Sequence, residues 1–170
     1  MIINGQALLN KAPIKDMLTT KARGINGVSH GLAEVGYDIR LKQDIRFSPR
    51  AEGGPMISML KPETAMPIRH KGRFILASAI EKFQMPTGLA GIVHDKSTWA
   101  RKGLSVFNTV IEPGWNGFLT LELVFNGEED VHIPAGSGIA QVIFHQIIEQ
   151  ASYTGSYQDQ ADRPVPSKVR

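Results

Sequence analysis

The chain has 170 residues, of which 42% are hydrophobic and 21% are charged, and it contains no cysteine. This length and composition fit one globular domain, and they exclude a disordered chain, a disulfide-rich scaffold and any thiolate metal site. The net charge of +3 is too small to indicate a nucleic-acid-coating protein, but it is compatible with a small polyanionic ligand. With no apolar run of membrane length and no basic-then-apolar leader, the expected location is the cytoplasm, with no membrane partner.

The N-terminal part of the chain carries weak and interrupted signals. Residues 1–22 hold a broken apolar pattern with Pro13 inside it, which predicts a short strand or arm followed by a single helical turn. Residues 24–34 are rich in glycine and are expected to form a loop. Residues 48–67 combine glycines with prolines, so a second irregular loop is expected there.

Between and after these loops, short apolar runs bounded by turn residues predict strands. They cover residues 37–41, 45–47, 74–80, 89–93, 104–107, 118–125, 131–133 and 139–148. A short helix is expected over 97–102, with Ser97 as its N-cap and Gly103 just past its end. Many short strands with one short helix predict an all-β fold, either a distorted β-barrel or a jelly-roll-like arrangement.

The C-terminal residues 151–170 are polar, contain glycine and proline, and have no periodic apolar pattern. They are expected to form a tail, so that residues 1–150 make up a single domain with an N-terminal arm. Within the tail, residues 153–160 carry aromatic and amide side chains that would suit closure over a ligand. A disordered end is the more common reason for such a composition.

The segment Lys96-Ser97-Thr98-Trp99-Ala100-Arg101 places two cations and two hydroxyls around the start of the expected short helix. Helix N-termini present free N–H groups, and hydroxyl and ammonium donors add to them, so the segment would suit a phosphate group. A plain helix cap with solvated charges is the more common reason for this pattern.

The strand predicted over 118–125 carries a single acidic residue. Alternation puts Thr120, Glu122 and Val124 on one face, where apolar neighbours would partly desolvate the carboxylate and suit it to general acid/base catalysis. A solvent-facing glutamate on an amphipathic strand explains the same pattern and is the more frequent case. In the preceding Pro-Gly turn, Trp115 is either the wall of a ligand site or an apolar plug under the sheet.

Metal and nucleotide motifs of other enzyme classes are missing from the sequence. The five histidines do not show the helical spacing of zinc ligands, and the zinc deaminase signature requires cysteines. Any deamination by this chain would therefore have to proceed without that zinc machinery. Neither a P-loop nor a dinucleotide-binding fingerprint is present.

Taken together, these segments resemble the dCTP deaminase family, which shares its fold with the dUTP hydrolases. The resemblance is carried by residues 36–40, 74–86, 96–101, 109–117, 119–123, 140–142 and 157–160. The combination of Lys-Ser-Thr-Trp-Ala-Arg, Glu-Pro-Gly-Trp-x-Gly and Thr-Leu-Glu is specific, although no single piece would be sufficient.

The resemblance implies a dUTPase-type fold assembled as a homotrimer, with active sites at the subunit interfaces. It implies hydrolytic deamination of dCTP to dUTP and ammonia, which feeds the synthesis of dUMP and dTTP. It also implies that Mg²⁺ is bound through the nucleotide triphosphate and that no zinc takes part. The expected partner is a deoxycytidine nucleotide, and no nucleic acid is expected to bind.

The catalytic roles follow from the family by position. Glu122 corresponds to the general acid/base that moves protons between water, the cytosine ring and the departing ammonia. Ser97 and the backbone carbonyl near Val110 correspond to the groups that hold the attacking water. Arg101 corresponds to the residue that orients Glu122 and stabilises charge.

The nucleotide-binding positions implied by the resemblance are Lys96, Thr98, Val110, Glu112, Thr120, Leu121, Gln141, Tyr153, Ser156 and Gln160. In this assignment Lys96 and Thr98 contact phosphate, while Glu112 and the backbone of 120–121 face the sugar and base. Ser156 stands where relatives commonly have a phosphate-contacting lysine, which adds charge that a serine lacks.

Three other functions fit the same sequence. A dUTP diphosphatase on this fold would use Glu112 to activate water, and a bifunctional enzyme would use both Glu112 and Glu122. Glu122 favours deamination, because monofunctional hydrolases of this fold usually have an apolar residue there. A non-catalytic nucleotide-binding β-trimer would bind nucleotide without turnover, and the fold alone does not distinguish it from an enzyme.

Overall fold

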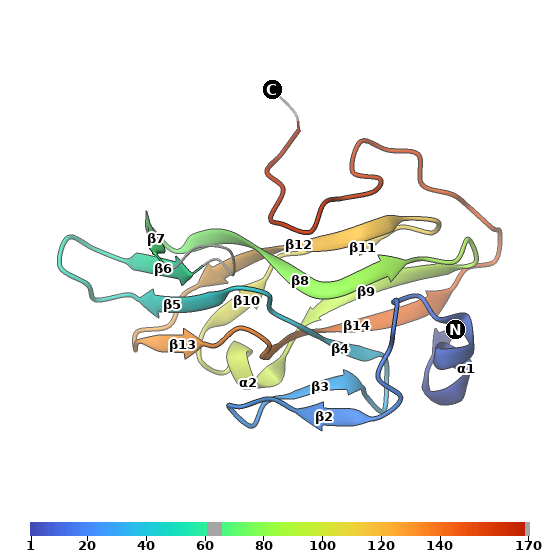
Figure 1. Ribbon diagram of the computed structural model, residues 1–170, viewed down its shortest axis with the longest axis horizontal. Coiled ribbons are helices and arrows are strands. Elements are labelled where there is room, and N and C mark those ends of the chain that lie inside the picture. Colours follow the sequence, from blue (N-terminus) through green and yellow to red (C-terminus); the bar gives the residue numbers. More distant parts are fainter. Residues whose placement is uncertain (61–65, 169–170) are drawn as a thin grey trace.

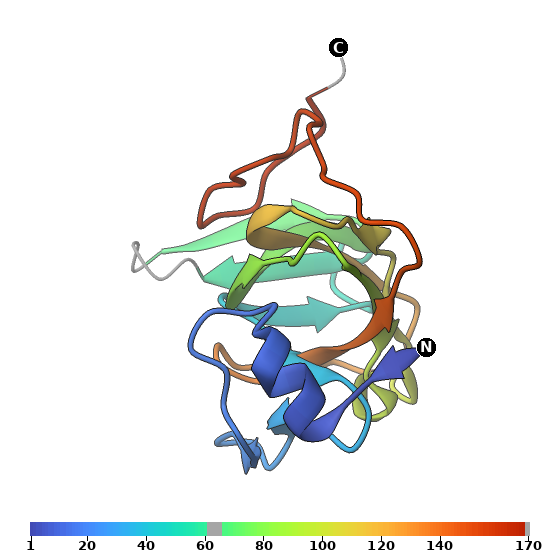
Figure 2. The same cartoon turned by 90° about the vertical axis from the view of Figure 1, so that its right-hand side faces the viewer.

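The computed structural model describes residues 1–60 and 66–168 and consists mainly of β-strands. The strands form three open sheets (Figure 1). The C-terminal tail lies on one side of these sheets, and the N-terminal helix lies on the other (Figure 2). Neither of the helices in the described ranges is long and apolar enough to cross a membrane.

The largest sheet has the strand order β11-β9-β14-β4-β3-β2, and β1 pairs with β14 beside this path. Its strands are β1 (Ile2–Ile3), β2 (Lys21–Arg23), β3 (Ser29–Leu32), β4 (Tyr37–Arg40), β9 (Leu89–Asp95), β11 (Val110–Ile111) and β14 (Gly138–Gln146). β14 is central, because it pairs with β4 and with β9, and alternate residues along it are buried.

Two smaller sheets and two helices complete the fold. The sheet β10-β12-β8 consists of β8 (Phe74–Gln84), β10 (Leu104–Val106) and β12 (Asn116–Phe125). The sheet β13-β5-β6-β7 consists of β5 (Asp44–Ser48), β6 (Met56–Leu60), β7 (Pro67–Lys71) and β13 (Val131–Ile133). The helices are α1 (Gly5–Lys11) and α2 (Ser97–Ala100).

Strand β12 follows the alternation that its sequence predicts. Leu121, Leu123 and Phe125 are buried, whereas Thr120 and Glu122 on the opposite face are half-buried. The buried face contributes to the core, where the Phe125 ring stacks on Phe47 of the neighbouring sheet with 4.9 Å between ring centroids. Burial of one face thus holds Glu122 on the other face, toward the tail.

Two features of the predicted fold are wrong. The single helical turn predicted within residues 1–22 is a seven-residue helix, α1, which follows β1 and buries Leu8 in the core, so the described residues form two short helices and not one. α1 ends where Ala12 takes a left-handed backbone conformation just before Pro13. The predicted distorted β-barrel or jelly-roll-like arrangement is confirmed as a mainly β fold, but its sheets do not close, since the described strands form three open sheets that share one core.

Both predicted loops also contain strands. Residues 24–34 include β3, which pairs with β4, and residues 48–67 include β6, which pairs with β5 and β7. Pro67 begins β7 at the edge of its sheet, where a missing N–H donor is tolerated. Residues 61–65 of the second predicted loop lie outside the described residues.

Candidate active site

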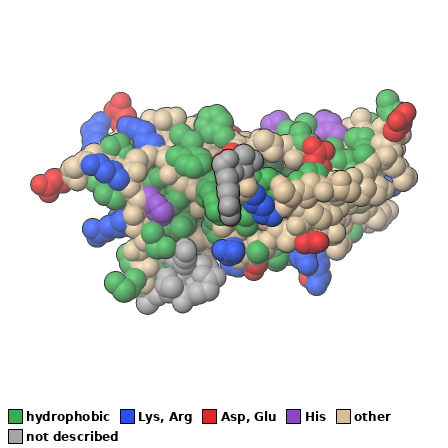
Figure 3. Space-filling model, turned by 90° about the horizontal axis from the view of Figure 1, so that it is seen from above, with side chains coloured by type: hydrophobic (Ala, Val, Ile, Leu, Met, Phe, Trp, Pro, Cys, Tyr) green, Lys and Arg blue, Asp and Glu red, His purple; other side chains and the backbone are tan. Residues whose placement is uncertain are grey.

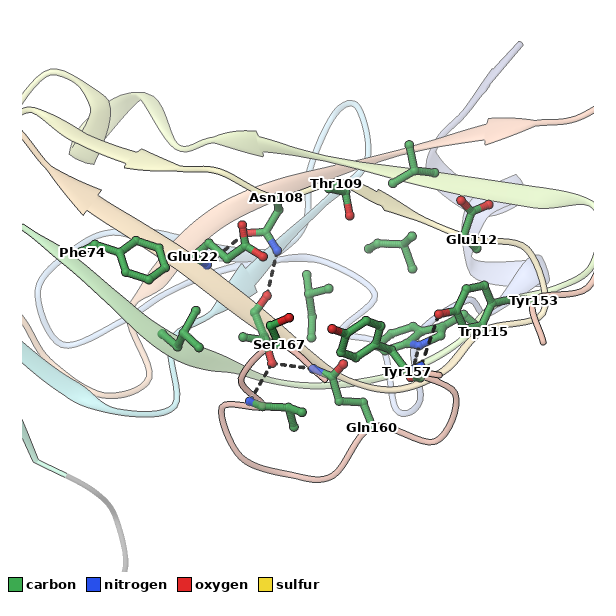
Figure 4. A pocket seen from close by; sticks show the side chains of 16 residues that line it. Phe74, Asn108, Thr109, Glu112, Trp115, Glu122, Tyr153, Tyr157, Gln160 and Ser167 are labelled. Carbon is green, nitrogen blue, oxygen red and sulfur yellow. Dashed lines mark hydrogen bonds between the residues drawn. The ribbon is translucent and has the colours of Figure 1, made fainter. Parts of the chain in front are cut away.

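A cavity of about 580 Å³ lies between β11, β12 and the C-terminal tail (Figure 4). Apolar side chains such as Phe74, Leu76 and Leu119 form much of its wall. Two carboxylates, Glu112 and Glu122, are among the residues that line it. A largely apolar cavity with a few polar groups is typical of a small-ligand site.

Glu122 reaches the cavity from β12, with its side chain directed into the open space (Figure 4). Its backbone is held from the β10 side of the strand. The carbonyl oxygen of Glu122 accepts a hydrogen bond from Phe107 N at 2.9 Å, and its N–H donates to Asn108 Oδ1 at 3.3 Å. The backbone of Glu122 is therefore fixed, and its half-buried carboxylate can exchange protons with a ligand in the cavity.

The tail is attached to β12 beside Glu122. Phe118 N donates to the carbonyl oxygen of Gln160 at 3.1 Å, and Gln160 forms a parallel bridge with Gly117. A Cβ atom at Gly117 would lie 2.5 Å from Gln160 N, so only glycine permits this approach. Thr120 Oγ1 accepts two hydrogen bonds from the tail, at 2.5 Å from Gln160 Nε2 and at 3.0 Å from Val165 N.

Three aromatic residues form the end of the cavity nearest the turn. Trp115 is buried, its ring centroid lies 6.0 Å from that of Phe83, and its Nε1 donates to the carbonyl oxygen of Tyr157 at 2.7 Å. Trp115 therefore both lines the cavity and plugs the core beneath it. Tyr157 N donates to the hydroxyl of Tyr153 at 3.3 Å, which joins both tyrosines to the same wall.

The Tyr157 hydroxyl also contacts the last described part of the tail. It accepts a hydrogen bond from Lys168 N at 3.0 Å, and this bond, together with one from Ser167, lowers the pKa of the Tyr157 phenol. The Lys168 ammonium lies 5.2 Å from the centroid of the Tyr157 ring and donates to the carbonyl oxygen of Ser156. On the face of the molecule that carries the tail, lysine and arginine side chains are interspersed with acidic ones (Figure 3).

Six of the residues predicted for the site line the cavity together. They are Val110, Glu112, Thr120, Glu122, Tyr153 and Gln160. The backbone of Leu121 continues the same strand, although its side chain is fully buried in the core. Ser156 is exposed in the tail, and Gln141 on β14 donates from Nε2 to the carbonyl oxygen of Val35 at 2.7 Å.

The second predicted group lies on α2, which both cartoon views place away from the tail (Figure 1, Figure 2). Ser97, Thr98 and Arg101 are exposed there, and none of them lines the cavity of the same chain. The helix begins at Ser97 with Lys96 as its N-cap, so the expected Ser97 cap is wrong. Trp99 fixes α2 to the domain, since it is buried and its Nε1 donates to the carbonyl oxygen of Gly138 at 2.7 Å.

Lys96 lies between α2 and the largest sheet. Its Nζ is 2.5 Å from Asp38 Oδ2 and 3.1 Å from Ser29 Oγ, and its side chain is 10% exposed. The lysine thus neutralises a buried aspartate on β4, and the structure gives it a role inside the subunit.

Several residues of the cavity wall are not among the predicted site residues, for example Asn108, Phe74 and Ser167. Asn108 follows β10 in a short link and belongs to no periodic pattern, so only its position beside the matched segment 109–117 pointed to it. Across residues 1–60 and 66–168, no group of three or more histidine, aspartate or glutamate side chains could hold a metal ion.

Comparison with known proteins decides the family. The sequence model described as dCTP deaminase-like matches residues 8–147. The chain belongs to the dCTP deaminase-like family. A family relative, the dCTP deaminase of Protochlamydia amoebophila (strain UWE25), is 31% identical, with 93% of this chain and 92% of the relative covered. The dCTP deaminase of Campylobacter hominis is 35% identical, with 84% of this chain and 82% of the relative covered.

The fold of this family member is also similar to a solved dUTPase structure. A mutant dUTPase of Staphylococcus bacteriophage 80alpha, solved with dUpNHpp, matches with a TM-score of 0.51 and 14% identity. The match covers 81% of this chain and 88% of the dUTPase. The predicted dUTPase-type fold is thereby confirmed at the level of the subunit.

Proposed function

We propose that this protein catalyses the hydrolytic deamination of dCTP to dUTP and ammonia, with Glu122 as the general acid/base. The observation that carries the proposal is the half-buried Glu122 carboxylate directed into a nucleotide-sized cavity, within the family segment Thr120-Leu121-Glu122. Water must lose a proton as it attacks C4 of cytosine, N3 must gain one, and ammonia must leave. One positioned carboxylate can move these protons in turn.

We further propose that α2 of a second copy completes the site, in a homotrimer. Ser97 and Arg101 are exposed on α2 and do not line the cavity of their own chain, although the chemistry needs a group to hold water and a cation beside Glu122. An apolar surface beside the cavity supports contact between copies. Val110 of β11 pairs with Ile92 of β9, and their side chains are 46% and 37% exposed. Phe107, which precedes β11, is 59% exposed.

Mg²⁺ would enter as part of the substrate. The two carboxylates that line the cavity, Glu112 and Glu122, belong to the proposed sugar and base end of the site. Among the described residues, no group of three or more histidine, aspartate or glutamate side chains could hold a metal ion. The phosphate oxygens of the nucleotide would be the main ligands of the ion, where it would neutralise charge. No residue of this chain is assigned to it.

The function is tested by incubation with dCTP, dCMP and dUTP in the presence of Mg²⁺, with ammonia and diphosphate measured separately. We expect ammonia from dCTP, little ammonia from dCMP and no diphosphate from dUTP, and the activity should withstand a zinc-selective chelator. Diphosphate release from dUTP without ammonia from dCTP would indicate a diphosphatase. Nucleotide binding without either product would indicate a non-catalytic protein.

We also propose that the tail closes the site. Truncation after residue 150 is expected to leave a folded protein with little deaminase activity, because it removes Tyr153 and Gln160 from the cavity wall, whereas no described side chain of the tail is buried. Thermal unfolding and the kcat and KM for dCTP would be measured side by side. Full activity of the truncated protein would show that the tail plays no part in catalysis.

A further inference from the structure

The Asn108 side chain occupies a gap in the strand pairing of β12. The register between β10 and β12 ends at Val106 opposite Leu123, and one more backbone bond follows, from Phe107 N to the carbonyl oxygen of Glu122, before the chain turns away to β11, which pairs with β9. At that point the side-chain amide of Asn108 makes the two hydrogen bonds to the β12 backbone that a neighbouring strand would otherwise make. Its Nδ2 donates to the carbonyl oxygen of Thr120 at 2.7 Å, and its Oδ1 accepts from Glu122 N at 3.3 Å.

The opposite edge of β12 is held by a regular strand. Thr120 pairs with Ser78 and Glu122 pairs with Leu76 of β8, in antiparallel register. The register shifts between Phe118 and Thr120, so regular pairing resumes only at Thr120, two residues before Glu122. A strand next to an irregularity bends more easily, and the Asn108 contacts are made at this position.

We propose that Asn108 is a positioning residue for Glu122. Asn108 lines the cavity, and each polar atom of its amide makes one hydrogen bond to the backbone of β12, on either side of Leu121. It fixes the backbone from which the Glu122 carboxylate extends, and displacement of a reacting group by about 1 Å costs on the order of 100-fold in rate. The inference rests on the proposed deamination and deepens it.

The test uses three variants of the full chain. Asn108→Leu matches the shape of asparagine and removes both hydrogen bonds, whereas Asn108→Gln keeps the amide on one additional methylene, for which the adjoining cavity has room. The matched control is Asn126→Leu, because Asn126 is exposed just past the end of β12 and does not line the cavity. For each variant, kcat and KM for dCTP are measured per folded protein, with thermal unfolding recorded in parallel.

Asn108→Leu is expected to lower kcat by about 10- to 100-fold and to leave KM within about threefold, with partial recovery in Asn108→Gln. A rise in KM at unchanged kcat would overturn the inference, since it would make Asn108 a substrate contact. Equal activity losses in Asn108→Leu and Asn108→Gln that track unfolding would also overturn it, by showing a structural role only. Absence of ammonia release by the wild type would instead refute the deaminase function itself.

Discussion

Glu122→Gln is expected to lower kcat for dCTP deamination by about 1000-fold and to leave the fold and nucleotide binding intact. The amide has the size of the carboxylate and keeps its place on β12, where the backbone contacts to Phe107 and Asn108 do not involve the side chain of residue 122. It cannot, however, accept a proton from water or return one to the cytosine ring. Removal of the sole acid/base thus affects the chemical step and not the binding step.

The measurement compares kcat for ammonia release with the dissociation constant for dCTP. Glu129→Gln is a matched control, because Glu129 is exposed beyond the end of β12 and does not line the cavity. Deaminase activity of Glu122→Gln within about tenfold of the wild type would remove Glu122 from the mechanism.

Mixing two inactive variants is expected to restore activity if the sites form between copies. Arg101→Ala and Glu122→Gln each lack one of the proposed groups, and in this chain Arg101 on the α2 side does not line the cavity that holds Glu122. In trimers assembled at random from equal amounts of both variants, about a quarter of the interfaces would combine an intact Glu122 with an intact Arg101 from the neighbouring copy. Deaminase activity should therefore rise from near zero to about a quarter of the wild-type value.

The mixture has to be co-expressed or refolded together, so that subunits exchange. Separately assembled variants, mixed without exchange, serve as the control and should stay inactive. No recovery after confirmed subunit exchange would show that Arg101 does not reach the Glu122 of another copy, and the interfacial site would have to be abandoned.

Several elements could be predicted from local sequence. The buried and half-buried faces of β12 follow directly from its alternating residues, because neighbouring side chains on a strand point to opposite faces. The Pro-Gly turn before β12 and the short helix at α2 also have local signals. The glycines of residues 24–34 predict a loop, but β3 forms there because β4 pairs with it, and local glycine content does not reveal that partner or its register.

The family, the mainly β composition and the carboxylate on which the proposed chemistry depends can all be read from the order of the residues. The folded chain was needed to show that Gln160 bonds to Thr120, that the Asn108 amide bonds to β12 beside Glu122, and that Lys96 is paired with Asp38. It also separated α2 from the cavity of its own chain. These arrangements join residues far apart in the chain, and their geometry depends on how whole sheets pack, which no local pattern encodes.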